Sequence, residues 1–322
     1  IRKHKTAVLI SDAFRYGCAV ELFAELEKDP TRTPEIKPML STIPSYTALG
    51  MASLLPNKEI SYQGDNILVD GMNCRSTDER NNILSSNVND VLAISYEDVD
   101  KLTINEFKEK MKGINLVYIY HNKIDARGDH APSENEVFNA AQETIEDLQK
   151  LITKLSTLNY AHSYITADHG FIYKRDKLKE HDLDKFPEKK HKRFILSEKP
   201  LKIDGAVSLS MEYLNMDKYV NVPIGADVFK AQGAGLNFVH GGASLEECIV
   251  PLLEVKAGKG AKNQRTVELQ LISTKNTITN YDVMLTFFQK ENVSQDVLPL
   301  EASVYFIDEE NNKIWIGTQN GL

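Results

Sequence analysis

Residues 164–171 read Tyr-Ile-Thr-Ala-Asp-His-Gly-Phe, so that an apolar run ends abruptly at an acid, an imidazole and a glycine. The run from His162 to Ala167 has the length and composition of a buried strand in an α/β protein. Ligands of such proteins collect beyond the carboxyl ends of the strands, where Asp168 and His169 are expected. Both are good metal ligands, and Gly170 lets the backbone turn sharply beside an ion. An isolated Asp-His-Gly also occurs in ordinary polar turns, so the rest of the chain decides its meaning.

Two more apolar runs end at residues of the same kind. The run Thr6–Ile10 is followed by Asp12, and the run Asn115–Tyr120 leads into a polar segment, residues 121–130, that contains Asp125. Amphipathic helices are predicted at residues 16–27 and 134–158. Because strand, polar turn and helix alternate along the chain, the sequence predicts an α/β fold with a doubly wound, mainly parallel sheet.

The segment Pro44–Pro56 is predicted to contain a helix, because good helix formers fill its second half and a proline ends it. The helix would begin near Ser45 or Thr47, where free backbone N–H groups polarise a hydroxyl and attract an anion. Prolines punctuate an expected loop at residues 30–38, and residues 57–100 are polar and rich in turn formers.

A highly charged segment, Lys174–Phe194, is expected to be an exposed excursion. Its run Lys189–Arg193 is typical of a solvated charged surface, with contact to nucleic acid as the alternative. The formal net charge of −8 argues against a chain that coats nucleic acid through bulk electrostatics, but it leaves room for a local basic groove.

Residues 1–257 are predicted to form the α/β domain and residues 258–263 a flexible linker. Residues 264–322 alternate apolar and polar residues between turns, which predicts a small antiparallel β module, sandwich-like in form. The chain begins at Ile1 and not at methionine, so we expect a fragment of a longer protein, with the β module cut short at Leu322.

The composition is that of a globular protein, with 42% hydrophobic and 26% charged residues. No apolar run reaches the roughly 18 to 20 residues that cross a bilayer, and no signal peptide is visible. We therefore expect a cytoplasmic protein without a membrane partner. The 3 cysteines form no Cys-x-x-Cys pair, so neither a disulfide framework nor a thiolate zinc site is indicated.

Ligand-type residues thus follow several predicted strands. They are Asp12, Asp125, Asp129 or His130, Asp168, His169 and His240. A sheet places such residues along one edge, close in space although remote in sequence. Two metal ions held by carboxylates and imidazoles, with a hydroxyl between them, suit in-line displacement at phosphorus.

The order of five motifs resembles the alkaline phosphatase superfamily and, more narrowly, the PglZ family of bacterial phage-defence systems (BREX, phage growth limitation). The motifs are Val8–Asp12, Pro44–Thr47, Asp125–Asp129, Thr166–Gly170 and His240–Ser244. The resemblance covers about residues 1–256. It implies a metal-dependent phosphoester hydrolase, with phosphodiesters of nucleotides or nucleic acid as the expected substrate class and other defence-system proteins as partners.

The resemblance also implies a role for individual residues. One metal ion would be held by Asp12, Asp168 and His169, the other by Asp125, Asp129 and His240, with Thr47 as the nucleophile between them. Ser45 is the alternative nucleophile. Arg15 and Arg127 are candidates to orient a phosphate through bidentate hydrogen bonds.

The resemblance departs from the superfamily pattern at one position. Where that superfamily usually has Asp-x-x-Gly-His, Gly128 is followed here by Asp129 and then by His130. Either Asp129 is the ligand or a shift brings in His130. Zn²⁺ is the expected ion, and additional carboxylate favours Mn²⁺ or Mg²⁺ beside it.

A rival hypothesis keeps the fold as a partner-binding scaffold of a defence complex, with metals structural or absent. The ligand residues argue against it, because burying several unpaired carboxylates at one sheet edge is costly without cations. A sulfatase relative is disfavoured because the sequence has no Cys-x-Pro-x-Arg motif.

Overall fold

The computed structural model describes residues 4–130, 132–174, 183–184, 191–229, 237–257, 265–273, 284–293, 297–300, 302, 305–307 and 313–314. Contacts between residues divide the chain into two units, residues 1–261 and 262–322. The predicted linker, residues 258–263, lies outside the described residues. The predicted division into domains and linker therefore stays a prediction.

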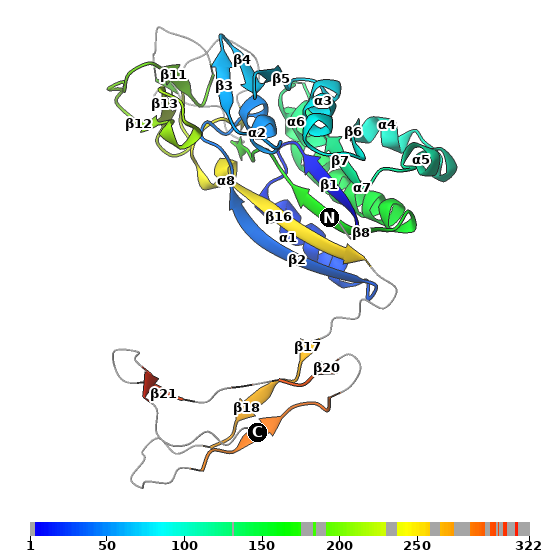
Figure 1. Ribbon diagram of the computed structural model, residues 1–322. Coiled ribbons are helices and arrows are strands. Elements are labelled where there is room, and N and C mark those ends of the chain that lie inside the picture. Colours follow the sequence, from blue (N-terminus) through cyan, green and yellow to red (C-terminus); the bar gives the residue numbers. More distant parts are fainter. Residues whose placement is uncertain are drawn as a thin grey trace. The chain divides into compact units, whose positions relative to one another are not determined.

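A six-stranded sheet in the order β2-β16-β8-β1-β7-β6 forms the centre of the first unit (Figure 1). Its strands are β1 (Lys5–Ser11), β2 (Arg32–Leu40), β6 (Val91–Ser95), β7 (Leu116–His121), β8 (Tyr160–Thr166) and β16 (Ile249–Ala257). Neighbours β8, β1, β7 and β6 are parallel, whereas β16 runs antiparallel to both β8 and β2. The predicted mainly parallel α/β sheet is confirmed.

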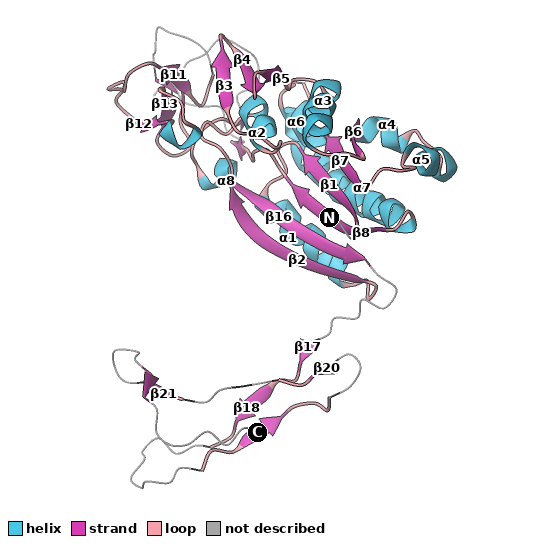
Figure 2. Ribbon diagram, viewed as in Figure 1, coloured by secondary structure: helices cyan, strands magenta, loops and turns pink. Residues whose placement is uncertain are grey.

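Both faces of the sheet are covered, as Figure 2 shows for the helices around the strands. Along β1, Ala7 and Leu9 belong to one hydrophobic cluster, whereas Val8 and Ile10 belong to the other. Because successive strand residues point to opposite faces, a strand buried on both faces reads as a continuous apolar run. This is why residues 6–10 predicted a central strand.

The helices divide between the two faces. Those of the first unit are α1 (Tyr16–Glu27), α2 (Thr47–Ser53), α3 (Thr77–Asn87), α4 (Tyr96–Asp100), α5 (Ile104–Lys110), α6 (Lys123–Gly128), α7 (Val137–Thr157) and α8 (Leu245–Cys248), with short 3₁₀ turns at Glu134–Glu136 and Glu212–Leu214. Buried residues of α1, α5 and α7 join the cluster of Leu9, and those of α2 and α3 join the cluster of Ile10. The helix α1 begins and ends where it was predicted.

The expected loop at residues 30–38 is wrong, because this segment forms the edge strand β2. It pairs along its whole length with β16, with Pro34 opposite Val255 and Pro38 opposite Pro251. A proline lacks the N–H that a ladder needs, but an edge strand has one side without a neighbour and tolerates it. The prolines therefore mark a sheet edge and not a loop.

Residues 57–100 contain more regular structure than their polarity suggested, namely α3, α4 and a small antiparallel sheet. That sheet consists of β3 (Ile60–Gln63), β4 (Asn66–Val69) and β5 (Met72–Asn73). The α3 helix begins with a capping box, in which Ser76 and Glu79 exchange side-chain to backbone hydrogen bonds. This local signal stabilises a helix that has few apolar residues.

The described residues of the first unit form three further small sheets. They are β11 (Ile195–Ser197), β13 (Tyr219–Pro223) and β12 (Ala206–Ser210); β9 (Ile172–Tyr173) with β15 (Phe238–Val239); and β10 (Leu183–Asp184) with β14 (Val228–Phe229). The pairing of β9 with β15 is antiparallel. It joins the segment just after His169 to the segment just before His240.

The described residues of the second unit form three two-stranded ladders. The antiparallel ladders are β18 (Leu269–Leu271) with β19 (Phe287–Gln289) and β21 (Phe306–Ile307) with β22 (Lys313–Ile314). The strands β17 (Arg265–Thr266) and β20 (Val297–Leu298) are parallel, unlike the purely antiparallel expectation. An alternating pattern predicts strands but not their direction, and the sandwich-like form stays a prediction.

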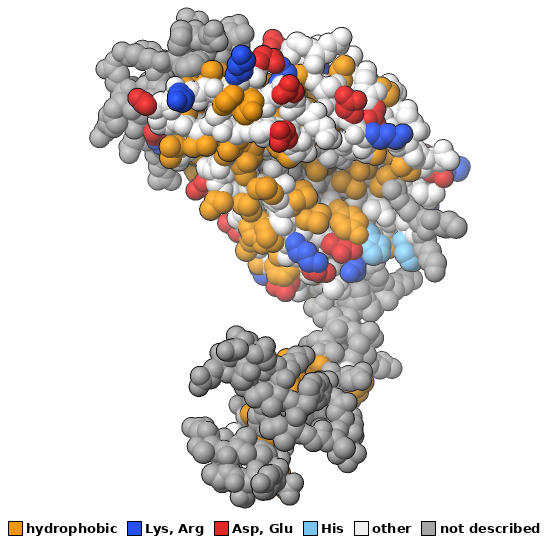
Figure 3. All heavy atoms as spheres, turned by 60° about the vertical axis from the view of Figure 1, so that its left-hand side comes forward, with side chains coloured by type: hydrophobic (Ala, Val, Ile, Leu, Met, Phe, Trp, Pro, Cys, Tyr) orange, Lys and Arg blue, Asp and Glu red, His pale blue; other side chains and the backbone are white. Residues whose placement is uncertain are grey.

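Among the described residues, no helix is long and apolar enough to span a bilayer. Figure 3 shows one face of the first unit, on which hydrophobic side chains form a broad band. Acidic and basic side chains are interspersed around that band. On this face the acidic side chains do not gather into a single patch.

Candidate active site

The carboxyl ends of three neighbouring parallel strands carry the candidate ligands. The strand β1 lies between β7 and β8, with Ile10 of β1 opposite Thr166 of β8. Asp12 follows β1 directly, Asp168 follows β8, and Asp125 lies on α6, which follows β7. The sheet therefore brings Asp12 close to Asp125 and Asp168, which lie more than a hundred residues after it in the sequence.

The first ligand set surrounds Nε2 of His169. This atom lies 3.4 Å from Oδ1 of Asp12 and 3.5 Å from Oδ2 of Asp168. All three residues are buried, with fractional exposures of 0% for His169, 2% for Asp12 and 1% for Asp168. Their ligand atoms are close enough to one another to bind a single ion.

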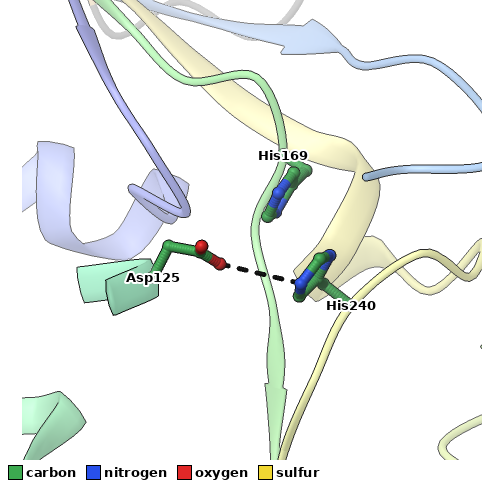
Figure 4. Close-up of side chains that lie close together, drawn as sticks. All are labelled: Asp125, His169 and His240. Carbon is green, nitrogen blue, oxygen red and sulfur yellow. Dashed lines mark ion pairs between the residues drawn. The ribbon is translucent and has the colours of Figure 1, made fainter. Parts of the chain in front are cut away.

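The second set surrounds His240, whose Nε2 lies 3.6 Å from Oδ1 of Asp125 and 3.6 Å from Oδ1 of Asp129. The rings of His240 and His169 are stacked, with centroids 4.2 Å apart and planes inclined by 7°. Figure 4 shows the two imidazoles side by side, with Asp125 of α6 pointing toward them. Since Asp125, His169 and His240 also form a compact ligand group, His169 lies between the two sets.

Thr47 lies beside the first set. It is the first residue of α2, and its Oγ1 lies 3.0 Å from Nε2 of His169. The hydroxyl of Ser45 is buried and donates to the carbonyl of Gly242 at 2.7 Å. Of the two hydroxyls considered from the sequence, the geometry therefore favours Thr47 as the one that faces the ligand sets.

The hydrogen-bond partner of Nδ1 shows which nitrogen of the His169 ring carries the proton. Nδ1 lies 2.8 Å from the carbonyl oxygen of Gly170, which only accepts hydrogen bonds, so Nδ1 carries the proton. Burial, together with the charge of His240, lowers the pKa of His169 to about 3. The ring is therefore neutral, and Nε2 directs its lone pair toward Thr47 and the two acids.

The remaining groups have strongly perturbed acidities. Burial, with the charges of Asp168 and Asp125, raises the pKa of Asp12 well above its ordinary value, and burial raises the pKa of Asp168 to about 6. Burial alone would lower the pKa of His240, but the hydrogen bond with Asp129 and the charge of Asp125 raise it to about 9. Crowded carboxylates in a protein interior favour a cation among them.

Several buried ligand atoms at this site have no hydrogen-bond partner in the described part of the chain. They are Oδ1 of Asp12, Oδ1 of Asp125, Oδ2 of Asp168 and Nδ1 of His240. Leaving such atoms without partners is costly, and a divalent cation satisfies carboxylate oxygens directly. The donor set of carboxylates and imidazoles therefore fits divalent metal ions.

The chain was compared with known protein families. A family model described as "BREX system PglZ alkaline phosphatase-like domain" matches residues 2–255. The chain belongs to the PglZ family. It is similar to the alkaline phosphatase-like protein PglZ of Bacillus cereus (strain H3081.97), with 41% identity over 97% of this chain. It is also similar to the alkaline phosphatase-like protein BrxZ of Escherichia coli O9:H4 (strain HS), with 32% identity over 95% of this chain.

The chain spans only 38% and 37% of the lengths of these two relatives. Among solved structures, human ectonucleotide pyrophosphatase/phosphodiesterase 5 superimposes with a TM-score of 0.52 and 14% identity, covering 77% of this chain and 87% of that one. An inactive form of the murine protein in complex with AMP gives 0.51 and 12%, covering 79% and 88%. These likenesses show the fold.

Three further residues considered for the PglZ site are not brought into the ligand sets. The guanidinium of Arg15 lies over the ring of Phe171, 4.8 Å from its centroid. Arg127 binds the carboxylate of Glu143 through both terminal nitrogens, at 2.9 and 2.8 Å. The side chain of His130 is exposed, whereas Asp129 contacts His240, so the geometry favours Asp129 as the ligand.

Sequence reasoning missed one buried ion pair beside the PglZ site. Arg193, which was expected in an exposed charged excursion, has an exposure of 0% and binds Glu247, also at 0%. That expectation is wrong for Arg193, because a run of basic residues does not show which member turns inward. Ser244 and Glu247 have the spacing of a capping box, which the structure contains, but this spacing does not indicate a partner for the Glu247 carboxylate.

Proposed function

We propose that this chain is a metal-dependent phosphoester hydrolase with Thr47 as its nucleophile. The observation that carries the proposal is the position of the Thr47 hydroxyl beside two groups of carboxylates and imidazoles. Several buried oxygen and nitrogen atoms of these groups have no hydrogen-bond partner among the described residues. The known chemistry of two-metal sites, displacement at phosphorus, needs this combination. Membership of the PglZ family and the alkaline phosphatase-like fold support the same reaction class.

The distances between the candidate ligands support two ligand sets. Asp12, Asp168 and His169 would hold one ion, and Asp125, Asp129 and His240 the other. When bound, the ions would neutralise charge on the phosphoryl group and lower the pKa of the attacking hydroxyl. We propose Zn²⁺ as the natural ion, with Mn²⁺ or Mg²⁺ as the alternatives that a carboxylate-rich site favours.

The reaction would proceed in two displacements at phosphorus. In the first, Oγ1 of Thr47 forms a bond to phosphorus while the bond to the leaving oxygen breaks, and the hydroxyl proton ends on the leaving alcohol. In the second, water displaces Oγ1 and restores the threonine. The hydrogen bond from Nδ1 of His169 to Gly170 holds the imidazole in one orientation throughout.

For the substrate we propose phosphodiesters of nucleotides or nucleic acid, hydrolysed during bacterial anti-phage defence together with other defence-system proteins. An aromatic group beside the nucleophile supports this class. Tyr46, which precedes Thr47, lies 4.8 Å from Phe194 and 5.7 Å from His191 between ring centroids. Phe194 is 1% exposed, but the ring of His191, which stacks on it at 4.0 Å, is exposed, and bases stack on exposed rings of this kind.

The test is hydrolysis of bis-p-nitrophenyl phosphate against p-nitrophenyl phosphate by the full 322-residue chain. The protein is chelated and then refilled with Zn²⁺, Mn²⁺ or Mg²⁺, and metal content is measured alongside turnover. The proposal predicts metal-restored turnover that favours the diester. A protein that retains no metal and turns over neither ester would support the scaffold hypothesis instead.

A further inference from the structure

The strongest feature outside the ligand sets is the buried ion pair of Arg193 and Glu247. Nε of Arg193 donates to Oε1 of Glu247 at 2.9 Å, and Nη2 donates to Oε2 at 2.7 Å. This is the bidentate geometry that only arginine provides. A buried ion pair often adds little net stability, so its retention calls for another explanation.

Further hydrogen bonds of the pair tie loops together. Arg193 donates from Nη2 to the carbonyl of Gly225 at 2.9 Å and from Nη1 to the carbonyl of Asp227. Glu247 accepts from the backbone N–H of Gly242 at 2.8 Å and from that of Ser244 at 3.1 Å. The pair therefore uses four of the five guanidinium N–H groups and both carboxylate oxygens, and it fixes the loop that follows His240.

The same centre reaches the other two segments of the site. The carbonyl of Gly242 accepts the hydroxyl of Ser45 at 2.7 Å, and Ser45 lies two residues before Thr47. The carbonyl of Glu247 accepts the N–H of Gly170 at 2.8 Å, directly after His169. One buried centre thus connects the segments that carry Thr47, His169 and His240.

The packing at this centre leaves no room for a side chain at Gly241 or Gly242. A Cβ added to Gly242 would lie 2.5 Å from Nη2 of Arg193 and 2.7 Å from Oε2 of Glu247. A Cβ added to Gly241 would lie 2.7 Å from the ring of Phe194. Since atoms this close cannot be accommodated without movement, the guanidinium and the glycine loop hold each other in place.

We propose that the Arg193–Glu247 pair is a positioning device that sets the placement of Thr47, His169 and His240 relative to one another. The expected effect on catalysis rests on the proposed function. The placement of the three side chains, however, is a property of the metal-free protein. Small errors in placement are expensive, because a shift of about 1 Å in a reacting group costs about a hundredfold in rate.

The test uses the full chain with Arg193→Lys and Glu247→Gln, which preserve most of the side-chain volume. The control is the exposed pair of Lys218 and Glu198, broken by Glu198→Gln. The first readout is the set of imidazole NMR signals of His169 and His240 in the metal-free protein. The proposal predicts that both signals move in the two pair variants and stay in the control.

The second readout is metal binding by calorimetric titration, and the third is steady-state kinetics. Loss of a positioning group typically weakens metal affinity about 10- to 100-fold, which is the loss expected for both variants. The kcat is expected to fall at least about tenfold, with KM within about twofold, because placement and not substrate binding is impaired. Folded variants with unmoved imidazole signals and wild-type metal affinity would overturn the proposal.

Should both pair variants fail to fold, Ser45→Ala decides, since it cuts one link to Gly242 without leaving a buried charge. Movement of the His240 signals in that variant supports the positioning role, and unmoved signals overturn it. A wild-type protein that binds no metal and hydrolyses nothing would contradict the proposed function alone, because the imidazole signals still report on the ion pair.

Discussion

The hydroxyl oxygen of Thr47 lies 3.0 Å from Nε2 of His169. Because Nδ1 of that ring donates to the Gly170 carbonyl, Nε2 can only accept, and the threonine hydroxyl donates to it in the metal-free protein. The rotamer of Thr47 is therefore held toward the two acids of the first ligand set. In the proposed mechanism, this arrangement would direct the hydroxyl toward a bound phosphoryl group.

Asp12→Asn is expected to stabilise the metal-free protein. The pKa of Asp12 is raised by burial and by the charges of Asp168 and Asp125. An acid with a raised folded-state pKa gives up stability as the pH rises above its unfolded value, so the wild type is penalised at pH 7.5. The variant should melt about 2–4 °C higher at that pH, and the difference should vanish near pH 4.

The same variant should lose the stabilisation that added Zn²⁺ or Mn²⁺ gives the wild type, because it lacks one carboxylate ligand. Asp204→Asn, at an exposed position, is the matched control and should behave as the wild type in both melts. If metal-free Asp12→Asn melts at a lower temperature than the metal-free wild type at pH 7.5, the crowded carboxylates do not destabilise the protein as predicted.

Gly50→Ala tests the contact between α2 and the Asp168 segment. A Cβ at this position would lie 2.5 Å from the carbonyl oxygen and 2.8 Å from the Cβ of Asp168. The helix that carries Thr47 must therefore move away, and kcat should fall about 10- to 100-fold. In Gly17→Ala, the helical control, the added Cβ meets nothing within 4 Å, so turnover should be unchanged. Equal kcat values for the two variants would contradict this contact's importance.

Asp147 supports the segment that leads to Asp125. For this residue, the predicted change in melting temperature at neutral pH has the opposite sign to that of Asp12→Asn. Burial would raise its pKa, but hydrogen bonds from His121 and Lys123 and the charge of Lys123 lower it. A lowered pKa contributes stability that is present above about pH 4 and is lost as the pH falls further. Asp147→Asn should therefore melt lower than the wild type at pH 7.

The difference in melting temperature between Asp147→Asn and the wild type should shrink below about pH 4, as the wild-type carboxylate becomes protonated. Glu146→Gln, at the exposed neighbouring position of α7, serves as the control and should change little at either pH. A pH-independent difference would show that packing, and not the charge of Asp147, is responsible.

His191→Ala tests the proposed substrate class. The ring of His191 stacks on Phe194 beside Tyr46, and stacking of a base on an aromatic ring is worth about 1–3 kcal/mol. The KM for the p-nitrophenyl ester of thymidine monophosphate should rise about 5- to 160-fold, a range that follows from this stacking energy. The KM for methyl p-nitrophenyl phosphate, which has no base, should not change.

The control for His191→Ala is His162→Ala, on β8, where the imidazole lies 3.1 Å from Glu254. This variant should leave both KM values at the wild-type level. Equal effects of His191→Ala on the two esters would argue against a base-stacking role and would leave the substrate class open to small phosphoesters.

The main sheet could be predicted because its parallel strands are buried on both faces and therefore read as apolar runs, two of which are followed by an acid. Asp12 and Asp168 were identified in this way. The strand β2 was missed because Pro34 and Pro38 favour a loop unless the strand is known to lie at an edge. The helix α3 was missed because its buried apolar residues are only Ile83 and Leu84, although the Ser76 capping box marks its start.

Contacts between remote side chains could not be predicted. The stacking of His169 on His240 depends on the antiparallel pairing of β9 with β15, two strands of two residues each. Arg193 and Glu247 are distant in sequence, and each has an ordinary local explanation, a charge run and a capping box. Choosing Asp129 over His130 needs the side-chain direction at the end of α6, which spacing alone does not give.

The most direct test of the central claim is the kcat for bis-p-nitrophenyl phosphate of Thr47→Ala, refilled with metal ions after chelation. The control is Thr157→Ala, which changes a threonine at the far end of α7. The account predicts that Thr47→Ala binds metal ions as the wild type does but loses at least about a thousandfold in kcat, as expected for removal of a nucleophile, whereas Thr157→Ala keeps wild-type turnover. Hydrolysis by Thr47→Ala at the wild-type rate would contradict it.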